Sequence, residues 1–301
     1  MMNKNMMKTL LLPVLMVIAA PSLAEDVRLK YQGLELTASL EMATGKTVKD
    51  PLVLMTHGTL AHNKMEIMSQ LQGLLKSNEI NSLSINLGLG ISDRKGMYDC
   101  AVTHAHKHTD AVEEIALWVN WLKSRGANNI ILLGHSRGGN QTAWYASETD
   151  DSAIKKVILM APMTWSENYA LESYQSRYKK DLNSVLATAQ SLVNQGKAKT
   201  LMKNTDHIYC ENTTVTAESF VSYNKPDQRF NTPSLLTKIK QPVLVFAGSA
   251  DTTVKDLDKK VAPYLKKGKV DLSVIDGAGH MFRDLYAEDV VDQIVEYLAT
   301  E

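Results

Sequence analysis

The sequence has no excess of either charge, because 33 lysines and arginines stand against 33 aspartates and glutamates among 301 residues. After residue 24, no stretch is long and apolar enough to span a bilayer. It also has no internal repeat. These absences give no indication of binding to nucleic acid or to an anionic surface, of a membrane bundle or of a repeat architecture. A hydrophobic share of 44% is ample for the core of one large domain or two small ones.

The first 24 residues follow an export pattern. Lys4 and Lys8 precede an apolar run over residues 10–20, and small residues end the segment before an acidic pair. This order is typical of a secretory signal peptide, while the alternative is an N-terminal membrane anchor. Because the run is short for a span of ~20 residues, we expect cleavage after Ala24 and a periplasmic or secreted chain with no stable membrane span. Without the two lysines, 31 basic residues face 33 acidic ones, a formal charge of −2.

The most informative stretch is Gly134-His135-Ser136-Arg137-Gly138-Gly139. It lies between an apolar run at residues 130–133 and a helix-compatible segment at residues 140–147, so it predicts a strand, a tight turn and a helix. A Cβ at Gly134 or Gly138 would collide with the neighbouring strand and helix, and Ser136 would be held in a strained backbone. The serine then stands at a helix start whose first N–H groups are unpaired. The alternative is a glycine-rich turn that contains serine by chance.

Three further motifs favour a catalytic interpretation. His57-Gly58-Thr59 follows a predicted strand at residues 52–56, Asp251 follows one at residues 243–247, and His280 follows one at residues 270–275. This order of oxyanion loop, serine, acid and histidine resembles the α/β-hydrolase superfamily, as an exported member of the esterase/lipase or serine-aminopeptidase type. The resemblance implies an α/β fold with a mostly parallel central sheet flanked by helices.

The resemblance also implies a lid. Residues 25–162 and 240–301 correspond to the hydrolase core, and residues 163–239 to a helical lid inserted after the strand that follows the nucleophile turn. Four aromatic residues of this segment are expected to line the pocket or to pack the lid on the core. They are Trp165, Tyr169, Tyr174 and Tyr178.

The types of the candidate residues indicate their roles in nucleophilic catalysis. Ser136 is the candidate nucleophile, and His280 is the candidate base, because an imidazole can accept and return a proton near neutral pH. Asp251 would fix the tautomer of His280 and stabilise the imidazolium. Asp276 is the competing acid, but it does not match the acid position of the superfamily.

Two backbone N–H groups are expected to form the oxyanion hole, those of Thr59 and Arg137, with Leu60 as the alternative to Thr59. His57 is expected to be a structural member of its loop rather than a second base. The predicted reaction is acyl transfer from a small-molecule substrate to water, with no metal or organic cofactor.

Esterase activity is the preferred hypothesis for this reaction. A peptidase, amidase or dienelactone-hydrolase-like activity is the second. A catalytically silent binding protein of the same fold is the alternative of another class, and the intact set of Ser136, Asp251 and His280 argues against it.

A histidine-rich loop precedes the helix predicted from about residue 109. His104, His106 and His108 alternate, which on an extended segment places them on one side. They are expected to line the pocket or to serve the structure, and a metal site is the alternative.

The only two cysteines are Cys100 and Cys210. Both belong to segments expected at the carboxyl edge of the sheet, so they could be bridged in an oxidising compartment. Two buried free thiols are the alternative, and we favour the disulfide.

Overall fold

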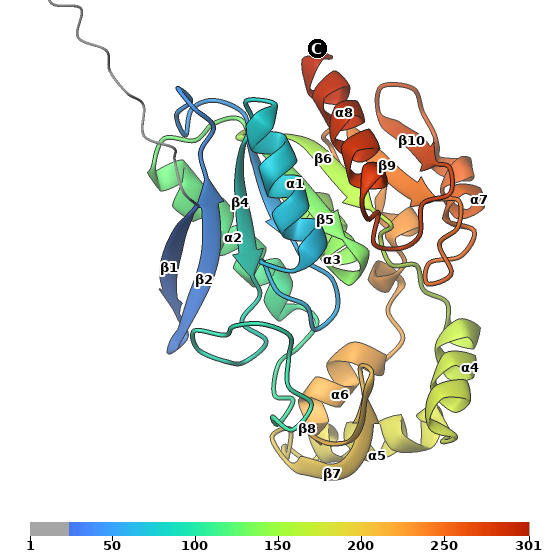
Figure 1. The fold of residues 1–301 in the computed structure, drawn as a ribbon. Coiled ribbons are helices and arrows are strands. Elements are labelled where there is room, and N and C mark those ends of the chain that lie inside the picture. Colours follow the sequence, from blue (N-terminus) through green and yellow to red (C-terminus); the bar gives the residue numbers. More distant parts are fainter. Residues whose placement is uncertain (1–23, 301) are drawn as a thin grey trace, which may run out of the picture.

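The computed structural model describes residues 24–300, so the predicted signal segment lies outside the described residues apart from Ala24. Its centre is an eight-stranded sheet in the order β1-β2-β4-β3-β5-β6-β9-β10 (Figure 1). The first two strands, β1 (Glu25–Tyr31) and β2 (Leu34–Glu41), form an antiparallel hairpin, and β2 also pairs antiparallel with β4. The other six strands are mutually parallel, as predicted. They are β3 (Leu52–Thr56), β4 (Asn81–Asn86), β5 (Ile130–His135), β6 (Ile154–Met160), β9 (Val243–Gly248) and β10 (Val270–Ile275).

Helices cover both faces of the sheet. Helices α1 (Glu66–Ser77) and α8 (Leu285–Ala299) lie on one face, and α2 (Asp110–Ser124) and α3 (Ser136–Glu148) lie on the other, while the short α7 (Leu257–Val261) follows β9 (Figure 1). The strands between them are buried on both sides, which explains their unbroken apolar sequences. In β3, Val53 and Met55 join the α1 and α8 core, while Leu52 and Leu54 join the other. Each such buried side chain stabilises the fold by about 1.5–3 kcal/mol.

The segment inserted between β6 and β9 has its own small core. It contains α4 (Glu167–Tyr178), α5 (Leu182–Asn194), an antiparallel hairpin of β7 (Leu201–His207) and β8 (Cys210–Thr216), and α6 (Ala217–Asn224). Two 3₁₀ turns follow, Gln228–Phe230 and Thr232–Leu235. Side chains of Ser166, Asp181 and Thr216 accept hydrogen bonds from the first turns of the three helices and fix where they begin. The hairpin was not anticipated from the sequence, which predicted only helices here.

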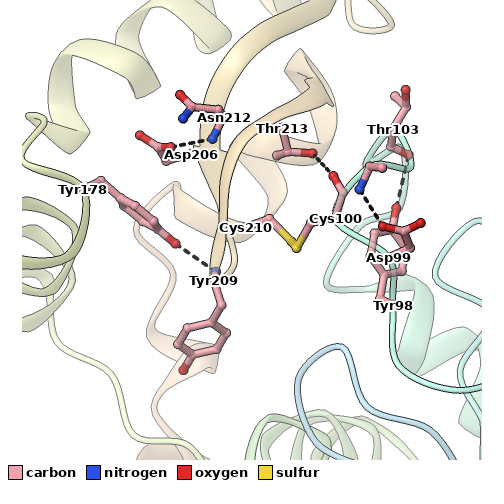
Figure 2. Close-up of a disulfide and its surroundings, with 11 residues drawn as sticks. Tyr98, Asp99, Cys100, Thr103, Tyr178, Asp206, Tyr209, Cys210, Asn212 and Thr213 are labelled. Atoms are coloured by element: carbon pink, nitrogen blue, oxygen red, sulfur yellow. Dashed lines mark hydrogen bonds between the residues drawn. A yellow bond between two sulfur atoms is a disulfide. The ribbon is translucent and has the colours of Figure 1, made fainter.

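A disulfide joins the inserted segment to the core. Cys100 lies in the loop after β4 and Cys210 begins β8, and their Cα atoms are 5.4 Å apart (Figure 2). The prediction of this bond is therefore confirmed. Hydrogen bonds continue the attachment: Thr213 Oγ1 donates to the Cys100 carbonyl at 2.7 Å, and the His104 N–H donates to the Thr214 carbonyl at 2.8 Å.

No helix among residues 24–300 combines the length and the apolar character that a membrane span needs.

Candidate active site

The loops that carry the candidate residues meet because four parallel strands end at the same edge of the sheet. His57-Gly58-Thr59 follows β3, Ser136 follows β5, Asp251 follows β9, and His280 follows β10. The carboxyl ends of adjacent parallel strands share one edge, so residues more than a hundred positions apart become neighbours. Strand order therefore assembles the site.

The turn at Ser136 is as tight as its glycines suggest. Ser136 has φ of +57°, a conformation unfavourable for a side-chain-bearing residue. A Cβ added at Gly134 would lie 2.5 Å from the Gly138 carbonyl oxygen, and one at Gly138 would lie 2.2 Å from the His57 carbonyl oxygen. Since real Cβ atoms do not approach so closely, the predicted steric reason for both glycines is confirmed.

Ser136, His280 and Asp251 form one hydrogen-bonded chain. His280 Nε2 lies 2.9 Å from Ser136 Oγ, and His280 Nδ1 lies 2.8 Å from Asp251 Oδ2. Because a carboxylate only accepts, Nδ1 carries the proton and Nε2 is free to accept one from the serine. The competing acid, Asp276, instead accepts a hydrogen bond from Ser249 Oγ at 2.9 Å. The structure thus brings Asp251, rather than Asp276, to the histidine.

The Asp251 carboxylate is kept ionised by its partners. Its side chain is only 2% exposed, and burial alone would raise its pKa. The hydrogen bond from His280 and the N–H groups of Val254 and Thr253 outweigh burial and hold the pKa of Asp251 below its ordinary value. The aspartate therefore remains an anion against the histidine ring.

A neighbouring histidine positions the loop of His280. His135, the residue before the nucleophile, is buried, and its Nε2 lies 2.9 Å from the His280 carbonyl oxygen. Burial, with a smaller effect of His280, lowers the pKa of His135 to about 4. His135 is therefore neutral and donates this bond from Nε2. The sequence placed it in the motif but gave no sign of this role.

Arg94 holds the candidate oxyanion loop in place through hydrogen bonds. This buried guanidinium donates to the Ala61 carbonyl at 2.8 Å and to the Leu87 carbonyl at 2.8 Å, and it lies 3.2 Å from His57 Nε2. Burial and the Arg94 charge lower the pKa of His57 to about 3, so His57 is a neutral structural residue. The sequence gives no sign of this network, since a glycine-rich loop does not show where its arginine points.

The candidate oxyanion hole lies beside the serine. Thr59, Ser136 and Arg137 line the same cavity, and a Cβ at Gly58 would lie 3.2 Å from Ser136 Cβ. The Thr59 N–H makes no hydrogen bond to any residue that the structure describes, and the Arg137 N–H belongs to the first turn of α3, where no helical acceptor exists. Leu60, the alternative, is buried and does not line the cavity.

A cavity of about 890 Å³ extends from Ser136 into the inserted segment. The four aromatic residues noted in the sequence all line it, which is one of the two roles expected for them, and Tyr174 also packs in the small core of the inserted segment, which is the other. They are Trp165, Tyr169, Tyr174 and Tyr178. Aromatic walls of this kind suit an apolar or aromatic substrate group.

His104, His106 and His108 are buried and do not line this cavity. His106 Nδ1 lies 2.8 Å from the Tyr223 hydroxyl, and His108 Nε2 lies 3.2 Å from Asn140 Oδ1. Among residues 24–300, no group of three or more histidine, cysteine or acidic side chains is arranged to hold a metal ion. His106 and His108 thus pack the core loop against α6 and α3, and His104 packs it against the β7–β8 hairpin.

Comparisons with known proteins identify the family. Residues 48–284 match the family model described as "Serine aminopeptidase, S33". A Mycoplasma genitalium protein named as an esterase/lipase is 26% identical over 195 residues, which cover 61% of this chain and 69% of that protein.

Solved structures share the fold. Est1E from Butyrivibrio proteoclasticus, in complex with ferulic acid, superposes with a TM-score of 0.63 at 19% identity, covering 91% of this chain and all (100%) of that chain. The α/β hydrolase GrgF from Penicillium sp. sh18 gives 0.67 at 16% identity, covering 92% and 98%. A Paleococcus ferrophilus monoacylglycerol lipase gives 0.60 at 20% identity, covering 88% and 98%.

Proposed function

The chain belongs to the serine aminopeptidase S33 family of α/β hydrolases, and from that premise we propose that it hydrolyses carboxylic esters through a Ser136 acyl-enzyme. The observation that carries the proposal is the continuous chain from Ser136 Oγ through His280 to Asp251, with distances of 2.9 and 2.8 Å. These lengths are within the reach of a general base and of the carboxylate that orients it.

The proposed mechanism follows from which atoms donate and accept. His280 Nε2 takes the Ser136 proton as Oγ attacks the substrate carbonyl, and the N–H groups of Thr59 and Arg137 stabilise the oxyanion. His280 then returns the proton to the leaving group. Water, deprotonated by the same imidazole, attacks the acyl-enzyme and frees Ser136. Asp251 stays ionised throughout and stabilises the imidazolium.

An ester is preferred over a peptide as substrate because the cavity beside Ser136 is bounded by aromatic side chains, and because the similar proteins named above include an esterase/lipase and a monoacylglycerol lipase. The test compares p-nitrophenyl esters of short and long acids with thioesters and aminoacyl arylamides. We expect ester turnover that Ser136→Ala abolishes. Faster cleavage of aminoacyl arylamides by the wild type would instead establish a peptidase.

We propose that residues 163–239 act as a lid over the site. Support comes from the cavity, which continues from Ser136 to Tyr178 and Tyr209 of this segment, and from Met163, whose N–H donates to the Ser136 carbonyl at 2.9 Å. The lid thus begins at the nucleophile itself. Its aromatic residues would select the substrate.

We also propose that the mature protein works in the periplasm or outside the cell. The export pattern of residues 1–24 supports this, and so does the Cys100–Cys210 disulfide, because such bonds persist in oxidising compartments. Intact-mass analysis of the protein from the envelope fraction should give a chain that begins at Glu25. A chain that retains Met1 in the cytoplasmic fraction would refute export.

A further inference from the structure

The cavity beside Ser136 has a one-sided charge. Arg137, Arg177, Lys255 and Lys260 line it, whereas no aspartate or glutamate does so among the described residues. None of these four cations forms an ion pair with a carboxylate within residues 24–300, although ion pairs are common elsewhere on this protein. A cleft lined by one sign of charge attracts ligands of the opposite sign.

Arg137 follows Ser136 directly in sequence and lines the cavity with it. Its Nε donates to Thr59 Oγ1 at 3.1 Å, which holds the side chain across the candidate oxyanion loop. Its guanidinium also lies over the Tyr223 ring, 5.4 Å from the ring centre. All these partners are neutral, so the charge of Arg137 is not compensated.

His108 holds the other side of the guanidinium. Asn140 donates its amide N–H groups to Arg229 and Thr232, so its Oδ1 accepts from His108 Nε2 at 3.2 Å. His108 Nδ1 is then the unprotonated nitrogen, and it accepts from Arg137 Nη1 at 3.4 Å. Burial and the Arg137 charge keep the pKa of His108 well below its ordinary value, which preserves this acceptor. The second terminal nitrogen, Nη2, makes no hydrogen bond to a described residue.

We infer that Arg137 binds a carboxylate of the substrate, and that the ester cleaved at Ser136 is anionic. This inference rests on the proposed function and adds the substrate class. A guanidinium held on neutral supports, with donors left over beside the nucleophile, matches a carboxylate better than any neutral group. The carboxylate can belong to the acyl part, as in a half-ester of a dicarboxylic acid, or to the leaving group.

The first experiment compares kcat/KM for p-nitrophenyl hemiglutarate with that for p-nitrophenyl pentanoate, which has a neutral chain of equal length. The second compares 4-carboxyphenyl pentanoate with 4-carbamoylphenyl pentanoate, which moves the charge to the leaving group. In one of the two pairs we expect the anionic ester to be preferred, and the pair that shows it identifies the source of the carboxylate.

Arg137→Gln should lower that anionic-to-neutral ratio by about 10- to 100-fold, as expected for the loss of one charge-assisted hydrogen bond. Arg137→Lys should restore part of it. Arg177→Gln is the matched control, because it removes an equal charge from the cavity wall at a residue that lies over Tyr209, with its guanidinium 4.5 Å from the ring centre. It should change the ratio much less than Arg137→Gln.

A further experiment uses only the wild-type protein and measures how well a ligand protects Ser136 from chemical labelling. Glutarate should protect wild-type Ser136 from a fluorophosphonate more strongly than its neutral diamide. Three results would overturn the inference while Ser136 still reacts. They are equal protection by glutarate and its diamide, a wild-type preference for neutral esters in both pairs, and an anionic-to-neutral ratio that Arg137→Gln leaves unchanged. A folded protein whose Ser136 does not react would overturn the proposed function and the inference together.

Discussion

At the scale of single residues, the candidate site depends on side chains that hold the candidate catalytic residues and loops in position. Asp251 orients His280 through its side chain, and His135 holds the same residue through its carbonyl. Arg94 supports the oxyanion loop through the Ala61 carbonyl. Each of these residues acts on the geometry or charge state of a neighbour, so its replacement should lower turnover.

Asp251→Asn should reduce turnover strongly while the fold stays nearly intact. The amide removes the negative charge that stabilises the His280 imidazolium and can hold the ring in the wrong tautomer. A loss on the order of 10⁴-fold in kcat is expected, the value known for the corresponding change in a protease triad. Ester hydrolysis and circular dichroism measured on the same preparation check this. Asp276→Asn is the control, because Asp276 bonds Ser249 instead, and turnover near wild type is expected for it.

Gly138→Ala should damage both stability and activity. The new Cβ would meet the His57 and Thr56 carbonyl oxygens at 2.2 and 2.7 Å, so either the helix start or the oxyanion loop must move. A loss of about 1–3 kcal/mol in the free energy of unfolding is expected, as for overpacking elsewhere. Gly73→Ala in α1 is the matched control, because nothing lies within 4 Å of its added Cβ. It should instead stabilise the protein by about 0.5–1 kcal/mol. Equal effects of the two changes in urea unfolding would contradict this account.

At the scale of elements, the inserted segment is attached to the core at several points. The disulfide joins β8 to the loop after β4 (Figure 2). His104 also pairs with Val215 of β8 as an isolated parallel bridge. Histidine side chains fill the space between them, with the His104 and His207 rings 5.1 Å apart. These contacts attach the inserted segment to the core loop.

Removing the disulfide should lower stability. It closes a loop of 110 residues, for which the chain-entropy model gives up to about 4–5 kcal/mol. The double variant Cys100→Ser, Cys210→Ser should unfold at lower urea than the wild type, and dithiothreitol should shift only the wild type. Two titratable thiols in unreduced, denatured protein would show that the bond does not form.

The sequence predicted the elements with strong local patterns. The apolar strands and the glycine turn at Ser136 were recognisable, because burial on both faces and tight turns each demand particular residues. The β7 and β8 hairpin was missed, because its connection uses Ile208 and Tyr209 at positive φ rather than glycine or asparagine. Arg94 and His135 were missed as positioning residues for a different reason: their partners are backbone carbonyls brought close only by the fold.

At the scale of the whole molecule, buried histidines make stability depend on pH. Burial lowers the pKa of His57 and His106 to about 3, and that of His104 and His135 to about 4. These groups stay neutral in the folded protein at pH values where the unfolded chain takes up protons, below the ordinary histidine value of about 6.5. Their contribution to stability is therefore complete above that value and lost as the pH falls. Burial raises the pKa of Glu114 to about 8, so the contribution of Glu114 to stability is instead lost as the pH rises. Glu114 is a single group, however, and the histidines outnumber it.

The free energy of unfolding should accordingly fall as the pH is lowered from about 6.5 to 4. Each histidine contributes up to about 1.4 kcal/mol per pH unit in this window. Urea unfolding at pH 7.5, 6 and 5 measures the slope. His104→Asn should reduce the slope by about one histidine's share. A free energy that is constant between pH 7 and 5 would mean that these histidines are not buried as described.

The whole account depends on one activated serine, and its reactivity can be measured without knowing the natural substrate. A fluorophosphonate should form one adduct per wild-type chain, which mass spectrometry should locate on Ser136. His280→Ala should abolish labelling, because without the base the hydroxyl stays protonated and weakly nucleophilic. A folded wild-type protein that is not labelled, or labelling that survives Ser136→Ala, would contradict the account.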